Sequence, residues 1–162
     1  MHKDSTAYTI LVIEDNTGDA LLIREYLHEH IASPEILEAA TYAAAIRFLE
    51  SRGNSIDFIL LDLTLPDLRG EELIQGILDA SGDIPVMVLT GYNDLGFAVR
   101  SMEMGVSDYF LKDDLTAFSL YKRSITIWSA SNTTRKLNAR AGDTTISSIS
   151  ARNPCAFSMC TP

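Results

Sequence analysis

Short apolar runs alternate with segments of helical period along the first 130 residues of the chain. The runs lie at residues 8–13, 35–39, 56–62, 84–89 and 109–111. Between them, apolar side chains recur every three or four residues, as Ala20, Ile23, Leu27 and Ile31 do, so each intervening segment has one apolar face. Five alternating strand and helix pairs predict an α/β fold, a doubly wound five-stranded parallel sheet with helices on both faces.

Polar residues that favour caps mark the ends of the predicted helices. Residues Asn16 to Asp19 can cap the first helix, Thr41 the second, and Asn93 or Asp94 the fourth. We expect the fifth helix to start at Asp113 or Asp114 and to run to about Trp128.

Reactive side chains follow four of the apolar runs at the point where each run ends. Glu14 and Asp15 follow the first run, Asp62 ends the third, Thr90 follows the fourth and Lys112 follows the fifth. In an open parallel sheet the carboxyl ends of the strands share one edge, and ligands bind there. The sequence therefore predicts that three carboxylates, a hydroxyl and an ammonium meet at one site.

Length and charge narrow the class of protein. A chain of 162 residues favours a single core. Residues 1–130 hold 9 Lys and Arg against 21 Asp and Glu, and an acidic body argues against nucleic-acid binding. No apolar run approaches the length of a membrane span, and no signal-peptide region precedes the first acids. We expect a cytoplasmic protein with no membrane partner.

The pattern stops after residue 130. Residues 131–162 are rich in Ser, Thr and Asn and hold few large apolar side chains, so burial there cannot offset the entropy of ordering the chain. We therefore predict a domain over 1–130 and a disordered tail over 131–162, with no separate output domain within these residues. The cysteines, Cys155 and Cys160, and the three histidines are not spaced as metal ligands, and we expect the histidines to be solvated or at helix ends.

The predicted cluster of acids needs a compensating charge. Two unit charges about 4 Å apart repel by roughly 4 kcal/mol at an effective dielectric of about 20. Mg²⁺ is the natural partner, because it binds one or two carboxylates and keeps water ligands that a phosphate can displace. Asp62 could then attack a phosphoryl group while Lys112 stabilises its oxygens. Thr90 could bind the product, and Tyr109 could respond to that contact.

The same residues resemble the receiver domain of bacterial two-component response regulators. The resemblance covers about residues 8–128 and rests on four ordered motifs. They are the acidic pair Glu14 and Asp15, the segment DLTLPDLRG that starts at Asp62, the segment VLTGYND that contains Thr90, and the segment DYFLK that ends at Lys112.

The resemblance implies a flavodoxin-like fold with strand order 2-1-3-4-5 and a phosphorylation-activated switch. Asp62 would accept a phosphoryl group from a phosphohistidine on a sensor histidine kinase or a histidine phosphotransfer protein. Mg²⁺ would be held by Asp15, Asp62 and the Thr64 carbonyl, with Glu14 binding directly or through water. Thr90 and Tyr109 would act as the paired switch.

The resemblance also implies a face that binds a downstream protein, and the chain departs from the family pattern directly after Lys112. A downstream protein would bind the face formed by the fourth helix, the fifth strand and the fifth helix. Tyr92, two positions after Thr90, would slow loss of the phosphoryl group. Lys112 is followed by Asp113 where the family usually has proline, so the loop after the fifth strand is expected to differ while the ammonium is kept.

Two other functions compete with this hypothesis. A phosphatase of the haloacid-dehalogenase type also uses an aspartyl nucleophile, but it needs an acid two residues later, where this chain has Thr64. A nucleotide-binding domain would need a glycine-rich phosphate loop, and neither common form is present. We therefore expect no turnover of an external substrate, and at most self-phosphorylation from small donors and autodephosphorylation.

Overall fold

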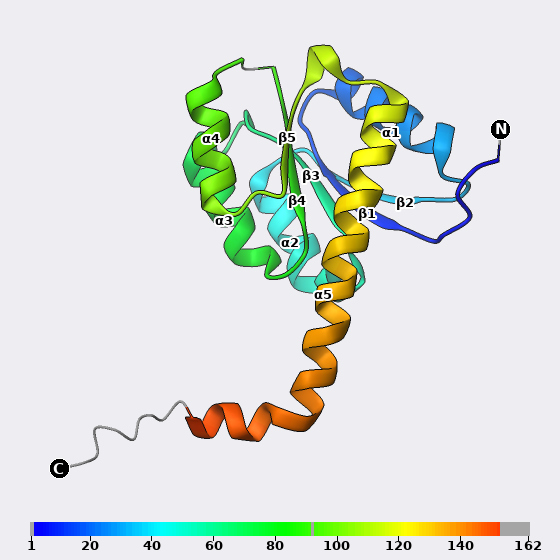
Figure 1. Ribbon diagram of the computed structural model, residues 1–162. Helices are drawn as coiled ribbons and strands as arrows, with labels where there is room; N and C mark the ends of the chain where they lie inside the picture. The colour runs from blue at the N-terminus through cyan, green and yellow to red at the C-terminus, as the bar shows by residue number, and fades with distance from the viewer. Residues whose placement is uncertain (1, 92, 153–162) are drawn as a thin grey trace. The chain divides into compact units, whose positions relative to one another are not determined.

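Five parallel strands form one sheet in the order β2-β1-β3-β4-β5. The computed structural model describes residues 2–91 and 93–152. The strands are β1 (Thr9–Ile13), β2 (Glu35–Ala39), β3 (Phe58–Asp62), β4 (Val86–Thr90) and β5 (Asp108–Leu111). The register places Asp62 beside Leu89 and Thr90 beside Leu111, so the strands end at one edge (Figure 1). The predicted α/β class and strand order are confirmed.

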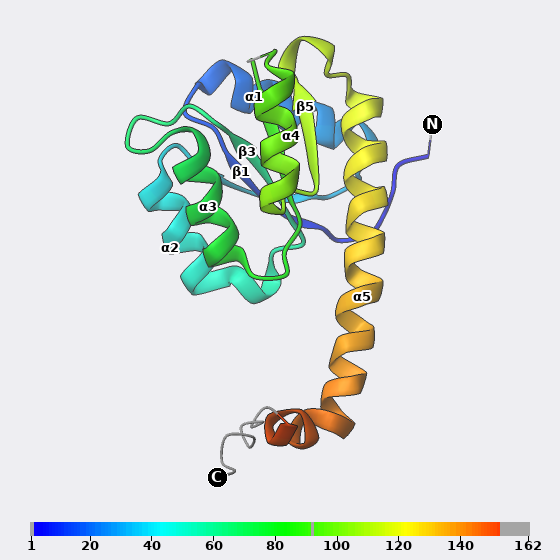
Figure 2. The same ribbon diagram turned by 60° about the vertical axis from the view of Figure 1, so that its left-hand side comes forward.

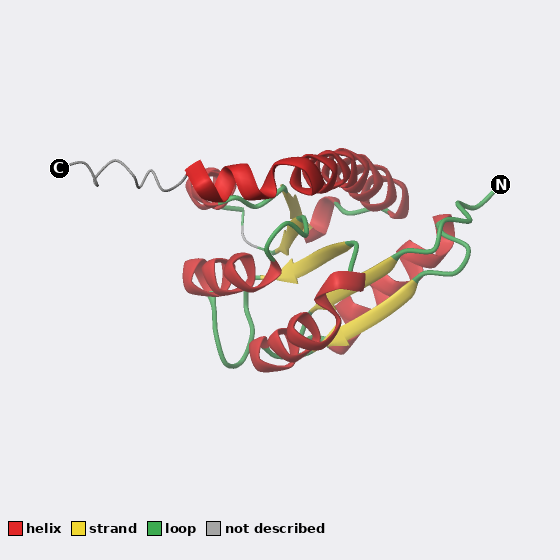
Figure 3. Ribbon diagram, turned by 90° about the horizontal axis from the view of Figure 1, so that it is seen from below, coloured by secondary structure: helices red, strands yellow, loops and turns green. Residues whose placement is uncertain are grey.

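Helices cover both faces of the sheet, as Figure 3 shows from below. The helices are α1 (Thr17–His30), α2 (Tyr42–Arg52), α3 (Gly70–Ser81), α4 (Leu95–Met104) and α5 (Ala117–Arg152). Since side chains alternate between the faces of a strand, one apolar cluster joins Leu11, Ile59 and Val88 to α2, α3 and α4. Figure 2 shows these three helices next to one another. A second cluster joins the alternate strand residues, such as Ile10 and Leu60, to α1 and α5.

The predicted caps are confirmed at three of the helices. Asn16 accepts from the backbone N–H of Asp19, and Thr41 and Asp94 cap α2 and α4 in the same way. The predicted start of α5 is wrong. Lys112–Asp114 form a short 3-10 turn instead, and α5 is capped by a reciprocal pair in which Thr116 and Ser119 each accept from the other's backbone N–H.

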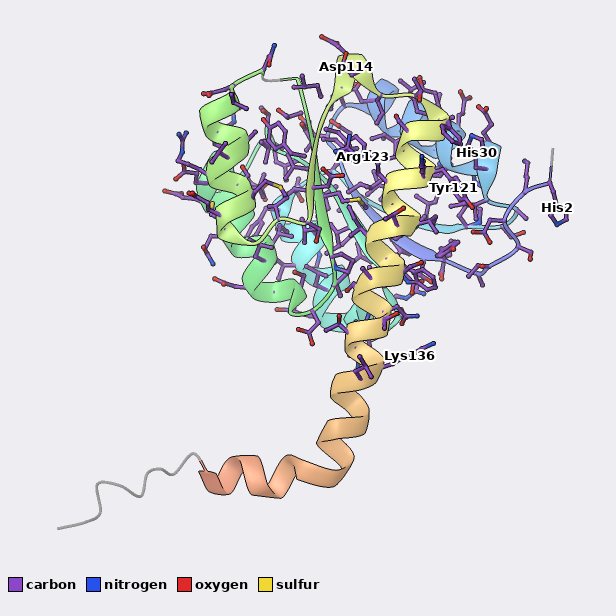
Figure 4. All side chains as sticks on the ribbon, in the orientation of Figure 1. His2, His30, Asp114, Tyr121, Arg123 and Lys136 are labelled. Atoms are coloured by element: carbon purple, nitrogen blue, oxygen red, sulfur yellow. The ribbon has the colours of Figure 1, made fainter. Side chains whose placement is uncertain are left out.

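The junction between α1 and α5 contains a buried histidine. His30 ends α1 as predicted, but it is buried, and its ring stacks on Tyr121 at 5.2 Å between ring centres (Figure 4). The Tyr121 hydroxyl donates to Asp4, which also accepts from the hydroxyl of Tyr8. The expectation of a solvated or helix-end position is met by the helix end, and the ring is buried there because α5 packs over the end of α1.

Helix α5 extends beyond the compact unit of residues Met1–Trp128. The backbone is helical to Arg152, and residues 153–162 lie outside the described part of the chain, so the disorder expected over 131–162 stays a prediction. No proline interrupts the helix, and the hydroxyls of Thr133 and Thr134 donate to carbonyls one turn earlier. The predicted domain boundary at residue 130 stays a prediction. Among the described residues, no helix is long and apolar enough to cross a membrane.

Candidate functional site

The structure brings the predicted site residues together at the carboxyl edge of the sheet. Glu14 and Asp15 follow β1, Asp62 ends β3, Thr90 ends β4, and Lys112 follows β5. Carboxylate oxygens of Glu14, Asp15 and Asp62 all lie within 4.8 Å of one another. Glu14 and Asp62 are buried, whereas Asp15 is exposed. The arrangement presents a carboxylate cluster that solvent can reach from one side.

A cavity of about 640 Å³ opens over this cluster. Its lining residues are Glu14, Asp15, Asn16, Thr17, Asp19, Asp62, Thr64, Gly91 and Lys112. The cavity therefore gives access to Asp62, and every lining residue except Gly91 has a polar or charged side chain.

Lys112 is the cation of the site. Its Nζ lies 2.6 Å from Glu14 Oε2, 2.8 Å from Asp19 Oδ2 and 3.4 Å from Asp62 Oδ1. Burial lowers the pKa of Lys112, but hydrogen bonds to Asp19 and Glu14 and the charge of Asp62 raise it overall. Lys112 therefore stays an ammonium at neutral pH.

The 3-10 turn that begins at Lys112 carries this ammonium to the site without a proline. No cis peptide bond occurs among the described residues, so the bond to Asp113 is trans. The expectation that the loop differs while the ammonium is kept agrees with this geometry. Figure 4 marks Asp114, the last residue of the turn.

Burial and neighbouring negative charge raise the pKa of the two buried acids, Glu14 and Asp62. Burial raises the pKa of Glu14 to about 6, although hydrogen bonds from Lys112 and from the Asn16 backbone N–H lower it. Burial also raises the pKa of Asp62, as does the charge of Asp15, while Lys112 acts in the opposite direction. Both acids therefore carry negative charge only at a cost, which a bound cation would reduce.

The donor set fits a hard divalent cation. The clustered atoms are carboxylate oxygens, and with Asp19 the site holds four acids against the single ammonium of Lys112. Mg²⁺ prefers oxygen ligands and is bound through one or two carboxylates together with water. The site residues therefore match the predicted cofactor in chemistry and in charge.

The loop after β3 is anchored at both of its ends. The Gly70 N–H donates to the Leu63 carbonyl, and Gly70 takes φ +64°, which favours glycine. The Asp67 carboxylate accepts from the backbone N–H groups of Tyr42 and Ala43 at the start of α2. Thr64 is thereby held beside Asp62, although the role of its carbonyl as a metal ligand stays a prediction.

Thr90 and Tyr109 lie on neighbouring strands behind the cluster. Thr90 is buried and Tyr109 is half-buried. Burial raises the pKa of Tyr109, and a side-chain hydrogen bond with Thr90 lowers it. The two side chains are therefore in contact, and their switch roles stay a prediction. Tyr92 lies outside the described residues.

The sequence reasoning missed one member of the site. It treated Asp19 only as part of the cap region, whereas the structure places its carboxylate on Lys112. Two signals were available. Asp19 lies four residues after Asp15, and side chains on a helix tilt toward the N-terminus, which here faces the site.

Comparison with known proteins agrees with this geometry. Residues 10–118 match the response regulator receiver domain family. The chain is 29% identical over 105 residues to the transcriptional regulatory protein CitT of Halalkalibacterium halodurans, covering 65% of this chain and 46% of that protein. It spans 21% of the regulatory protein LuxO of Vibrio cholerae, at 30% identity over 102 residues, which are 62% of this chain. It thus spans less than half of these relatives.

Two solved structures illustrate the similarity of the fold. A response regulator receiver domain protein from Clostridium thermocellum has 31% identity and a TM-score of 0.67, with 80% of this chain and 98% of that chain covered. The Mn(2+)-bound form of response regulator Rcp1 has 28% identity and a TM-score of 0.58, with 75% and 90% covered.

Proposed function

We propose that this chain, which belongs to the response regulator receiver domain family, is a phosphorylation-activated switch with Asp62 as phosphoacceptor. One observation carries the proposal. Asp62 is buried at the floor of an open polar cavity, with the Lys112 ammonium 3.4 Å from its carboxylate and two further acids beside it.

The transfer step follows from the positions of these groups. An Asp62 carboxylate oxygen attacks phosphorus, the bond from phosphorus to the donor imidazole nitrogen breaks, and its electron pair leaves with the imidazole. The Lys112 ammonium stabilises negative charge on the phosphoryl oxygens. Mg²⁺ held by Glu14, Asp15, Asp62 and the Thr64 carbonyl would supply further positive charge there, and the Mn(2+)-bound form of Rcp1 supports a divalent cation.

Storage of the phosphoryl group is the proposed outcome, rather than turnover of a substrate. A phosphatase with an aspartyl nucleophile needs an acid and base near the leaving group. Thr64 stands two residues after Asp62, and the nearby acids Glu14 and Asp19 are both paired with Lys112. A haloacid-dehalogenase type of phosphatase is therefore the weaker candidate, and we propose that the chain is not a turnover enzyme.

Two protein partners are proposed. The donor would be a phosphohistidine on a sensor kinase or a phosphotransfer protein, in the cytoplasm. The target would bind the face formed by α4, β5 and α5, where Leu95, Val99 and Met102 are exposed on α4. Since the chain spans less than half of CitT and LuxO, their regulatory output is not transferred to it, and its acidic body argues against a nucleic-acid partner.

Mass measurement tests the proposal directly. The protein is incubated with Mg²⁺ and acetyl phosphate, and the intact mass of the wild type is compared with that of Asp62→Asn. We expect one phosphoryl adduct on the wild type, none on the variant, and none without Mg²⁺. An adduct of equal yield on Asp62→Asn would refute the assignment of the phosphoacceptor.

A further inference from the structure

Asp19 places a fourth carboxylate at the site. It is the third residue of α1, its backbone N–H is taken by the Asn16 cap, and its side chain is 43% exposed. Its Oδ2 accepts from Lys112 Nζ at 2.8 Å. Asp19 lies outside the group of three acids whose oxygens cluster within 4.8 Å, so its contact is with the ammonium.

The contact with Asp19 limits how the Lys112 ammonium can rotate. A lysine ammonium has three N–H donors and rotates freely about its last bond unless its partners hold it. Glu14 and Asp19 accept at 2.6 Å and 2.8 Å, whereas Asp62 is at 3.4 Å. Two donors are therefore committed to strong contacts, and the third is the one that faces Asp62.

We propose that Asp19 is a positioning residue for phosphoryl transfer. Together with Glu14 it fixes the Lys112 ammonium so that the remaining N–H points to the place where a phosphoryl oxygen arrives beside Asp62. This inference rests on the proposed function. Glu14 alone leaves the ammonium free to rotate about a single contact, and the transition state then loses part of its preorganised charge.

A purely structural role for Asp19 gives different expectations. An acid in the first turn of a helix interacts favourably with the helix dipole, whatever lies beyond the helix. Such a role affects the stability of α1 and leaves the Lys112 ammonium as it was. Measurements of the ammonium and of the phosphorylation rate separate the two roles.

The test uses the full chain with Asp19→Ala, Asp19→Glu and the control Asp113→Ala. Asp113 is exposed, follows Lys112 directly, and makes no ion pair among the described residues. The initial rate of adduct formation from acetyl phosphate at saturating Mg²⁺ is measured by intact mass. The ¹⁵N signal of the Lys112 ammonium, which is visible only when the group is held and exchanges slowly, is recorded without a phosphodonor.

We expect Asp19→Ala to form the adduct about tenfold more slowly, equivalent to roughly 1.4 kcal/mol in the barrier, and to lose the ammonium signal. Asp19→Glu restores both because its carboxylate can still reach Nζ, and Asp113→Ala resembles the wild type. If Asp19→Ala unfolds, Asp19→Asn replaces it as the smaller change, with a weaker effect in the same direction expected.

Three results overturn the inference. They are a wild-type or faster rate in Asp19→Ala, an ammonium signal that survives in that variant, and an equal loss of rate in Asp113→Ala. Each leaves the proposed function standing, because the wild type still forms its adduct. A wild type that forms no adduct refutes the proposed function, and the inference then falls with it.

Discussion

Replacing Glu14 by glutamine should stabilise the metal-free protein at neutral pH. The Glu14 side chain is 1% exposed, and burial raises its pKa from an ordinary value of 4.5 to about 6 even with Lys112 in contact. Each tenfold change in proton affinity corresponds to about 1.4 kcal/mol, so ionising Glu14 costs the folded state roughly 2 kcal/mol relative to the unfolded chain. Glutamine has nearly the same shape without the charge.

The sign of the pH dependence follows from the two pKa values. Between pH 4.5 and about 6 the folded protein keeps a proton on Glu14 that the unfolded chain has released, so the wild type loses stability as pH rises through this range. Below pH 4.5 the acid is protonated in both states, and Glu14→Gln should then match the wild type. Above about pH 6 the variant should be more stable by roughly 2 kcal/mol.

Urea unfolding at pH 4 and at pH 7.5 in the presence of a chelator measures this difference. Glu25→Gln, which removes an exposed acid from α1, is the matched control and should change little at either pH. With Mg²⁺ at pH 7.5 the order should reverse, because cation binding stabilises the wild type and the variant has lost a ligand. A Glu14→Gln protein that is less stable than the wild type at pH 7.5 without metal would refute the reasoning.

Three further substitutions test contacts that hold the fold together. Asp67→Ala removes two acceptors from the start of α2 and should lower the free energy of unfolding by about 1 kcal/mol; an unchanged urea midpoint would contradict the cap. Gly76→Ala brings a Cβ to 2.6 Å from the Tyr42 hydroxyl and should cost about 1–3 kcal/mol, partly recovered by Tyr42→Phe in the same chain. Trp128→Phe removes the indole N–H donated to Asp57 and should cost about 1 kcal/mol in thermal unfolding, whereas no loss would show that the bond is dispensable.

The sheet was predictable because its three central strands, β1, β3 and β4, are buried on both faces and read as continuous apolar runs. The residue at which each strand starts was not predictable, because a polar residue inside an apolar run can precede the strand and make hydrogen bonds to other segments. Asp57 lies in the third predicted run but precedes β3, where its carboxylate accepts from the Thr9 N–H and from Trp128. These contacts join segments far apart in the chain, and the spacing of apolar residues along the sequence does not reveal them.

The site residues that follow or end a strand were predictable from the sequence. Glu14, Asp15, Asp62, Thr90 and Lys112 each follow or end a strand, so the topology alone brings them to one edge. Asp19 belongs to a helix, and its sequence neighbourhood is that of an ordinary helix start. Its position four residues after Asp15 indicates that it lies near the site, but its contact with Lys112 depends on how α1 lies against the turn after β5, which no local pattern specifies.

The acids of the site are held in a state that disfavours their own charge, and this makes the site responsive. Burial raises the pKa of both Glu14 and Asp62, so the folded protein keeps unfavourable electrostatic energy at the floor of the cavity. A bound cation would relieve part of it. A ligand shifts a conformational equilibrium only by its differential affinity for the two states. Lys112 is shared among three acids, so we expect a change in charge at Asp62 to alter the contacts that the ammonium makes with Glu14 and Asp19.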